Sequence, residues 1–200
     1  LGMTLWQVGG NDLEFTQAMR FTTFNVTSIL TGTGYATDDY SQWGGFAVVM
    51  FFFVMFIGGC VGSTSCGIKI FRFQILYAAA RTQMARLLQP HGVFVANFNR
   101  RPIPESVMDS VMSFFFLFAL SFAAIAVGLS LMGLDFLTAV SGAGTAIANV
   151  GPGLGDVIGP SGTFAPLPDM AKWLLAAGML LGRLELLTVM VLFTRTFWRG

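Results

Sequence analysis

Charged residues are scarce in this chain of 200 residues, where they make up 10% of the sequence instead of the roughly 25% found in soluble domains. Two stretches, 40–68 and 110–134, carry no charge at all. Each is longer than the ~20 apolar residues needed to cross the hydrocarbon core of a bilayer. With 54% hydrophobic residues and 21 Phe, the chain does not fit a soluble globular domain and is predicted to be a multi-pass membrane protein surrounded by lipid.

Acidic residues are absent between Asp39 and Glu105, whereas basic residues are frequent there. These basic residues are Lys69, Arg72, Arg81, Arg86, Arg100 and Arg101. An excess of Lys and Arg marks a cytoplasmic connection. Most acidic residues fall in the other connections, which we therefore place on the outer side: Asp12, Glu14, Asp38, Asp39, Asp135, Asp156 and Asp169. Basic residues after a third apolar segment, 173–194, predict a cytoplasmic C-terminus.

Cysteine and histidine are nearly absent. Cys60, Cys66 and His91 do not have the spacing of a zinc site or of a disulfide framework. The cysteines have no partner base and no pair of carboxylates converges, which disfavours a membrane-embedded enzyme. We expect the two cysteines to be small packing residues. The sequence predicts no cofactor in this chain and no nucleic-acid partner.

A Thr/Gly/aromatic run, Thr31-Gly32-Thr33-Gly34-Tyr35, follows the apolar stretch 12–30. Potassium-channel filters use a T-V-G-Y-G segment, in which carbonyl oxygens replace the hydration shell of the ion and glycines permit unusual backbone angles. The run 32–35 resembles the first four residues of that segment. We therefore predict a pore helix over 12–30 and a filter over 31–35. A plain glycine-containing turn is the alternative.

The same order recurs later in the chain. The stretch 134–148 is too short to cross a bilayer, and it ends at Asn149-Val150-Gly151-Pro152-Gly153-Leu154-Gly155. Non-helical backbone at membrane depth is tolerated only where it lines a watery cavity or is buried in protein. Two such breaks on the outer side favour a pore, and two ordinary extracellular loops are the alternative.

A third break is expected between residues 40 and 86, because a single helix of that length would be roughly 70 Å long at 1.5 Å per residue. The run 58–67, Gly-Gly-Cys-Val-Gly-Ser-Thr-Ser-Cys-Gly, is rich in poor helix formers. One interpretation is close helix packing on small residues. The other is an unwound segment that projects into the ion path.

Arg183 and Glu185 are the only charges well inside the third apolar segment. A charge at the bilayer centre costs roughly 2.5–3.5 kcal/mol on insertion scales, so each is expected to face the protein interior. Residues two apart point about 200° away from each other on a helix, so these two do not neutralise one another. We expect Arg183 to reach the 58–67 segment, and a structural ion pair with another helix is the alternative.

Five motifs in order resemble the C-terminal half of TrkH/TrkG-type potassium-uptake subunits of the Trk/Ktr/HKT superfamily. They are the residues 24–43, the run 57–64 with Lys69, the run 149–155, the run Gly182-Arg183-Leu184-Glu185, and the closing run 194–199. The chain begins with Leu1 and has no signal-peptide pattern. We therefore expect it to be the C-terminal part of a longer protein.

The resemblance implies an all-α membrane protein with potassium-channel-like tandem repeats of span, pore helix, filter and span. Residues 1–104 would be a third repeat that lacks its first span, with pore helix 12–30, filter 31–35, broken span 43–82 and cytoplasmic connection 83–104. Residues 105–200 would be a fourth repeat, with span 105–132, pore helix 134–148, filter 149–153 and span 170–196. It also implies a homodimer in the bacterial inner membrane and a cytoplasmic TrkA-type RCK ring as regulatory partner.

The resemblance further implies a set of site residues. Potassium, the transported ligand, would be bound by backbone carbonyls at the two filters: Gly32, Thr33, Gly34, Asn149, Val150 and Gly151. The gate below would comprise Gly62, Ser63, Thr64, Ser65, Cys66, Gly67, Lys69 and Arg183. Gated potassium permeation is the predicted function. The alternative is an ion-gradient-coupled secondary transporter with discontinuous helices.

Overall fold

The computed structural model describes residues 2–10, 14–60, 62–63, 67–89, 92, 94–98, 101–184 and 198. The described residues are mostly helical. The elements are α1 (Gly2–Gly10), α2 (Phe15–Leu30), the 3-10 helix η1 (Tyr40–Gln42), α3 (Gly45–Val54), α4 (Ile70–Leu88), β1 (Asn97–Phe98), β2 (Arg101–Pro102), α5 (Glu105–Leu131), α6 (Phe136–Ala148) and α7 (Asp169–Arg183).

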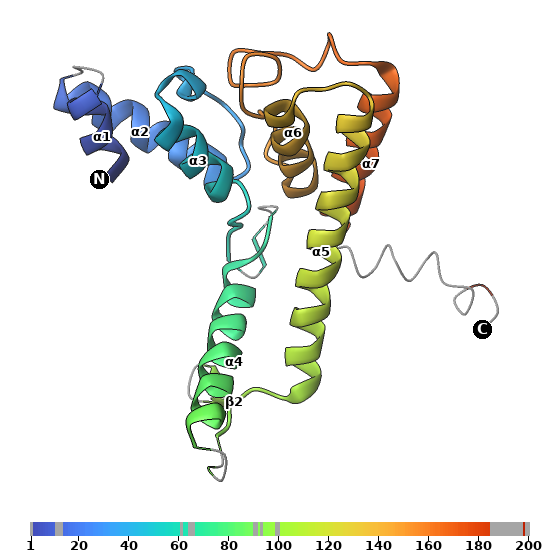
Figure 1. Ribbon diagram of the computed structural model, residues 1–200. Coiled ribbons are helices and arrows are strands. Elements are labelled where there is room, and N and C mark those ends of the chain that lie inside the picture. Colours follow the sequence, from blue (N-terminus) through green and yellow to red (C-terminus); the bar gives the residue numbers. More distant parts are fainter. Residues whose placement is uncertain are drawn as a thin grey trace.

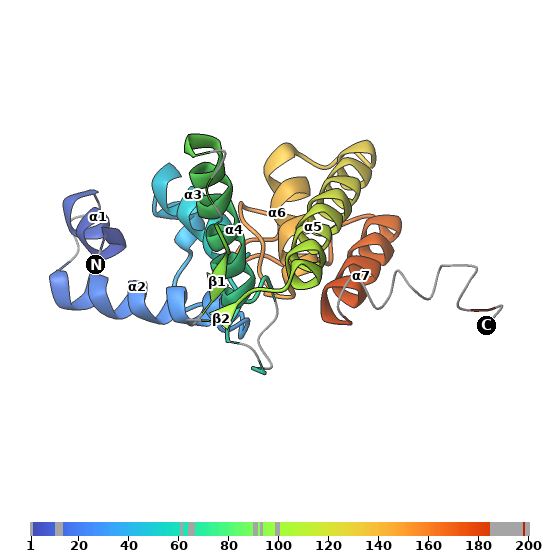
Figure 2. The same ribbon diagram turned by 90° about the horizontal axis from the view of Figure 1, so that it is seen from below.

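The long helix α5 runs the length of the molecule and organises the rest (Figure 1). Helices α6 and α7 pack beside its upper half, and α4 lies beside its lower half. Helices α1, α2 and α3 form a separate group at the upper left of Figure 1. Viewed from below, α4 and the β1–β2 hairpin stand between this group and α5 (Figure 2).

Helix α5 is the one described element that is long and apolar enough to cross a membrane. It starts after Pro104, with Glu105 in a first turn that favours negative charge. Its 27 residues give a length of about 40 Å. Its buried residues recur every three or four positions and so form one face: Val111, Phe114, Phe118, Ser121, Ile125 and Leu129.

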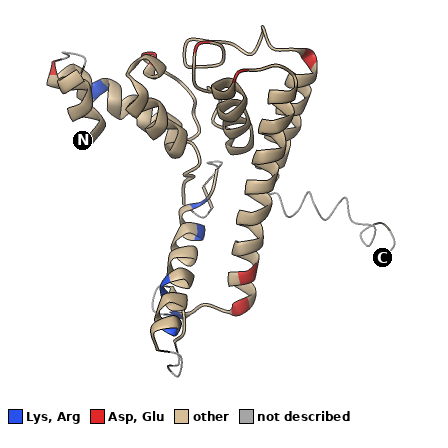
Figure 3. Cartoon of the chain, in the orientation of Figure 1, with Lys and Arg blue, Asp and Glu red and all other residues tan. Residues whose placement is uncertain are grey.

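Most basic residues lie together at one end of the molecule. Figure 3 shows Lys and Arg along α4, with Arg20 of α2 apart from them, while Asp and Glu lie on the loops at the opposite end and also at the start of α5, near the basic end. This is the distribution on which the predicted orientation rests.

Two helices lie within or near the predicted broken span 43–82, and the described residues between them, 55–60, 62–63 and 67–69, are not helical. Helix α3 ends at Val54 and α4 begins at Ile70. The short helices α2 and α6 lie within the stretches 12–30 and 134–148, and α7 ends at Arg183. The remainder of the predicted span 170–196, together with Glu185, lies outside the described residues.

Three elements have no counterpart in the sequence-based prediction. They are α1, η1 and the two-stranded antiparallel hairpin, in which Asn97 pairs with Pro102 and Phe98 with Arg101. The expectation that both cysteines pack in the interior is wrong for Cys60, because its side chain is exposed just beyond the end of α3. Cys66 and His91 lie outside the described residues.

Phenylalanines connect the two halves of the chain. Phe56, just after α3, makes edge-to-face contacts with Phe118 and Phe122 of α5, at centroid distances of 5.9 and 5.6 Å. Such pairs contribute about 0.5–1.5 kcal/mol each beyond the area that they bury. Gly144 of α6 faces the same group, since a Cβ there would lie 2.9 Å from the sulfur of Met55. The two repeats therefore share an aromatic core.

Asp135 caps the N-terminus of α6, where its carboxylate accepts a hydrogen bond from the Thr138 amide at 3.0 Å. Hydrogen bonds from the Thr138 side chain and backbone hold the pKa of this carboxyl below its ordinary value. The cap therefore stabilises the fold above the unfolded-state pKa of about 3.9 and is lost as the pH falls through the lower folded-state pKa. Asp135→Ala is expected to cost about 1 kcal/mol of folding free energy at neutral pH.

This expectation is checked by the thermal unfolding of the full-length protein in detergent at several pH values. The wild type and Asp135→Ala should differ at pH 7 and converge only as the pH falls through the lowered folded-state pKa of Asp135. Asp156→Ala is the matched control, because Asp156 is an exposed carboxylate that caps no helix. An equal loss in both variants would contradict the capping role.

Candidate functional site

Helix α2 ends in a reversal of the backbone at the predicted first filter. Gly32 has a φ of 68°, and its amide donates to the Ile29 carbonyl at 3.1 Å. The next amide, of Thr33, donates back to the Ser28 carbonyl at 2.9 Å. These two bonds are the Schellman arrangement, in which a left-handed residue lets the chain satisfy the last carbonyls of a helix.

Helix α6 ends in the same way at the predicted second filter. Asn149 takes the left-handed position with a φ of 52°, and its amide donates to the Ala146 carbonyl at 3.2 Å. The Val150 amide then donates to the Thr145 carbonyl at 3.1 Å. Gly32 corresponds to Asn149 and Thr33 to Val150. Gly34 and Gly151 form a third corresponding pair, because both have positive φ values, of 77° and 118°. The repeat is therefore geometric, although the residue types differ.

The direction of the carbonyls follows from these amide bonds. In a trans peptide the N–H points opposite to the C=O of the preceding residue, and no described peptide bond is cis. The amides of Thr33 and Val150 point back at their helices, so the carbonyls of Gly32 and Asn149 point away.

The next peptide in each segment repeats this pattern. The Gly34 amide donates to the Ser28 carbonyl at 3.4 Å, and the Gly151 amide donates to the Thr145 hydroxyl at 3.0 Å. The carbonyls of Thr33 and Val150 are therefore also directed away from the helix ends. Four carbonyls at the predicted ligand positions share one orientation relative to their helices.

The two segments meet at Gly34. A Cβ on Gly34 would lie 2.5 Å from the Val150 carbonyl oxygen and 3.1 Å from Cδ of Pro152. Only glycine permits this approach together with a positive φ. The structure thus brings the two predicted filters into direct backbone contact.

Hydroxyl and amide side chains that the sequence did not single out support the loops behind the filters. The Ser41 hydroxyl accepts from the Gly155 amide at 3.2 Å and so joins the two repeats. The Ser141 hydroxyl, fully buried in α6, accepts from the Leu154 amide at 3.0 Å. Asn25 exchanges hydrogen bonds with Thr37 at 3.1 Å. For Asn25 and Ser141, the sequence feature that could have indicated this supporting role is a polar residue within a short, mostly apolar helix.

The outer carboxylates Asp38 and Asp39 build the loop after the first filter. Asp38 accepts from the Trp43 indole N–H at 2.8 Å, and Asp39 accepts from the Ser41 amide at 3.0 Å. Among the described residues there is no group of His, Cys, Asp and Glu side chains that could hold a metal ion. The carbonyls directed away from α2 and α6 are oxygen atoms that the described site offers to a cation.

The stretch between α3 and α4 forms a loop with a hydrogen-bonded neck. The Gly58 amide donates to the Ile68 carbonyl at 2.8 Å, and the Ile68 amide donates to the Phe56 carbonyl at 2.9 Å. Gly67, with a φ of 79°, packs its Cα side on this neck, where a Cβ would lie 3.2 Å from the Phe56 carbonyl oxygen. The ends of the predicted gating segment are thus held together by backbone bonds.

The predicted gate residues fall at different places around this loop. Gly62 has a φ of 86°, and Ser63 follows it. Lys69 is the N-cap of α4, and Arg183 is the last residue of α7, with an exposed side chain. Thr64, Ser65 and Cys66 lie outside the described residues. The contact of Arg183 with the 58–67 segment stays a prediction.

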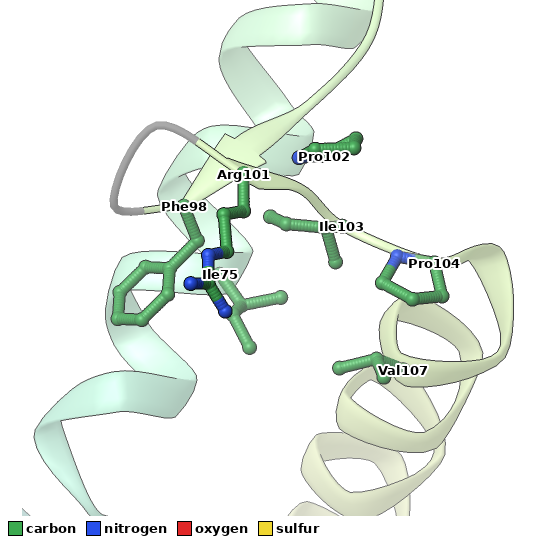
Figure 4. Close-up of a pocket in the computed structure, with 7 residues that line it drawn as sticks. All are labelled: Ile75, Phe98, Arg101, Pro102, Ile103, Pro104 and Val107. Atoms are coloured by element: carbon green, nitrogen blue, oxygen red, sulfur yellow. The ribbon is translucent and has the colours of Figure 1, made fainter.

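A pocket of about 500 Å³ lies far from the filters, between α4, the hairpin and the start of α5. Figure 4 shows Arg101 reaching from β2 toward Ile75 of α4, with Val107 of α5 on the other side. Aliphatic and proline side chains form most of its wall. It lies at the basic end of the molecule, and Arg101 is its one charged lining residue.

Two short helices, α2 and α6, end in matching glycine-containing segments whose carbonyls point away from the helices. Together with the neighbouring apolar helices, they define a pore-loop membrane protein. The comparisons with known proteins agree with this class. The chain matches the family described as TrkH, cation transport protein, over residues 11–199. The chain belongs to this family.

Its relatives are potassium uptake proteins. The chain is 56% identical over 199 residues to the Trk system potassium uptake protein TrkI of Halomonas elongata, covering 100% of this chain and 40% of that protein. It is 38% identical over 176 residues to the Trk system potassium uptake protein TrkH of Escherichia coli, covering 88% and 36% of the two chains. The crystal structure of the potassium transporter TrkH from Vibrio parahaemolyticus matches with a TM-score of 0.90 at 35% identity, over 98% of this chain and 42% of that one. This chain therefore spans about 40% of the length of such relatives.

Gly34→Ala is expected to push the two filter segments apart, because the new Cβ meets the Val150 carbonyl. Overpacking of this kind costs about 1–3 kcal/mol. The full-length protein should lose the thermal stabilisation that bound potassium gives the wild type. Gly133→Ala is the matched control, since Gly133 has a similar φ of 84° with nothing within 4 Å of the added Cβ. Equal effects of the two substitutions would assign the loss to backbone strain and not to the contact.

Proposed function

We propose that this chain supplies part of a gated potassium pathway through a membrane, as a Trk-system potassium uptake subunit. The observation that carries the proposal is the matched ending of α2 and α6, which directs four carbonyls away from the helices and joins the two segments at Gly34. Carbonyl oxygens arranged in this way replace the water around a potassium ion. The relatives named potassium uptake proteins support the choice of ion.

Each of the two segments provides one part of a selectivity filter. Gly32 and Thr33 offer their carbonyls on the first, with Gly34 closing the turn. Asn149 and Val150 do so on the second, with Gly151 in the corresponding place. The match to about 40% of the length of the relatives is consistent with most of a third repeat and all of a fourth, with the other filter walls contributed by the remaining length of such a protein.

The loop between α3 and α4 is the proposed gate. Its neck is held by backbone hydrogen bonds from 56–59 to 68–70, so the loop extends from a fixed base. A small change in the angle between α3 and α4 then moves the whole loop. Gly62–Gly67 would obstruct the path below the filter, with Lys69 and Arg183 as fixed positive charges beside it.

The regulatory arrangement follows the relatives and the charge pattern. The proposed location is the bacterial inner membrane, with the C-terminus and the basic α4 and hairpin in the cytoplasm. The proposed assembly is a homodimer regulated by a cytoplasmic TrkA-type RCK ring. A ring that pulls on α4 would bias the loop between two positions.

Cation flux through the full-length protein in liposomes is the direct test. Potassium flux should exceed sodium flux and run down the potassium gradient without a coupled ion. Flux that requires a proton or sodium gradient would support the secondary transporter with discontinuous helices. No flux of either cation, with the TrkA-type partner present, would overturn the proposal.

Replacing residues 61–66 by a two-residue turn is expected to raise potassium flux while the neck stays intact. Minor states of two-state elements are about 0.1–10% populated, so removing the block predicts a rise of roughly tenfold or more. The flux is measured in liposomes without the cytoplasmic partner. A Gly/Ser replacement of equal length is the control, because it keeps the bulk of the loop. Flux at the wild-type level in the shortened variant would contradict a gate at this position.

A further inference from the structure

Asn149 occupies a backbone conformation that is costly for most residues. It is the one non-glycine residue with a positive φ, 52°, in the described part of the chain. The matching position at the end of α2 is Gly32, with a φ of 68°. Glycine would satisfy the backbone at either place, and asparagine is among the few other residues that tolerate this conformation. The position therefore accepts asparagine, and its side chain is available for contact with a neighbouring element.

The Asn149 side chain is bonded to the last helix. Its amide nitrogen donates to the Met179 carbonyl in α7 at 2.9 Å, across 30 residues of sequence. The contact is partly buried. This hydrogen bond joins the end of α6 to α7 at Met179.

Helix α7 can come this close because glycine faces the end of α6. A Cβ on Gly182 would overlap the Ile147 carbonyl oxygen and would lie 2.6 Å from the Asn149 side-chain nitrogen. One turn earlier, a Cβ on Gly178 would lie 3.3 Å from Cβ of Ala146. The spacing of four residues puts both glycines on one face of α7. Arg183, the proposed gate charge, directly follows Gly182.

We propose that the Asn149 side chain is a positioning residue for ion selectivity, which anchors the second filter segment to α7. The proposal rests on the proposed function. Because Asn149 lies between the end of α6 and Val150, a displacement of α7 is transmitted to the peptide whose carbonyl is offered to the ion. Selectivity between ions depends on how firmly such carbonyls hold their positions. The first segment, with Gly32 in this place, has no equivalent side-chain anchor.

The test compares two substitutions that share the loss of the donated hydrogen bond. Asn149→Gly keeps the left-handed backbone without a side chain, and Asn149→Asp keeps the shape but has no N–H to donate. Each is made in the full-length protein, and the ratio of potassium to sodium permeability is measured in liposomes. Loss of one hydrogen bond predicts that the ratio falls by on the order of fivefold in both variants. Asn97→Gly and Asn97→Asp are the matched controls on the exposed hairpin and should leave the ratio unchanged.

The permeability ratio is a property of the folded protein, so a lower yield alone does not change it. Gly182→Ala offers an independent route, because it moves α7 away from Asn149 and leaves that residue in place. Gly128→Ala, where the added Cβ meets only the Leu174 side chain, is its control. A normal ratio in both Asn149 variants and in Gly182→Ala would overturn the inference. A change in Asn149→Asp alone would assign the effect to charge and overturn it as well, whereas absence of flux in the wild type would reject the proposed function instead.

Discussion

The planarity of the peptide bond is the constraint on which the site depends. At the ends of α2 and α6, the amides that follow the left-handed residue bond back to the helix, and the opposed carbonyls therefore face the other way. The helices satisfy their own last carbonyls and at the same time leave oxygens directed outward. No side chain is required for this orientation, so Thr33 and Val150 can occupy matching positions. The site is built from backbone, and the side chains serve to hold it in place.

The packing behind the predicted filters holds this backbone in place. Gly34 contacts the Val150 carbonyl, Ser41 binds the backbone of the other repeat, and Phe56 packs on α5. The first two contacts link residues 116 and 114 positions apart and the third links residues 62 positions apart, and none of them follows from local sequence preference. A two-filter arrangement therefore needs the aromatic core between the repeats as much as it needs the glycines. Charge is scarce and Phe is abundant in the same segments for one reason, since both features suit a lipid environment.

The order of the elements was predicted from the long uncharged stretches, the glycines and the uneven distribution of charge, because these features report directly on membrane physics. The ends of α2 and α6 fall where a polar residue interrupts an apolar run, whereas α3 ends at Val54, before the run reaches Gly58. The hairpin was missed because each strand has only two residues and shows no alternation. The neck between Phe56 and Ile68 was not predictable, since its pairing joins two backbones across a glycine-rich loop. For Asn149 the sequence indicated a carbonyl, whereas its side-chain bond to Met179 depends on how α7 packs.

The proposed filter segments and the neck of the proposed gate are linked by helices that pack on one another, and this placement bears on how they would work together. Residues of α7 that contact the end of α6 directly precede Arg183, and the phenylalanines after α3 pack against α5, which also contacts α7. In the proposed mechanism, a change of angle at the neck of the loop would reach the second filter segment through these packed helices. Cores packed at native density do not deform continuously, so such a change passes between discrete arrangements. A pathway of this design would have few intermediate states between closed and conducting.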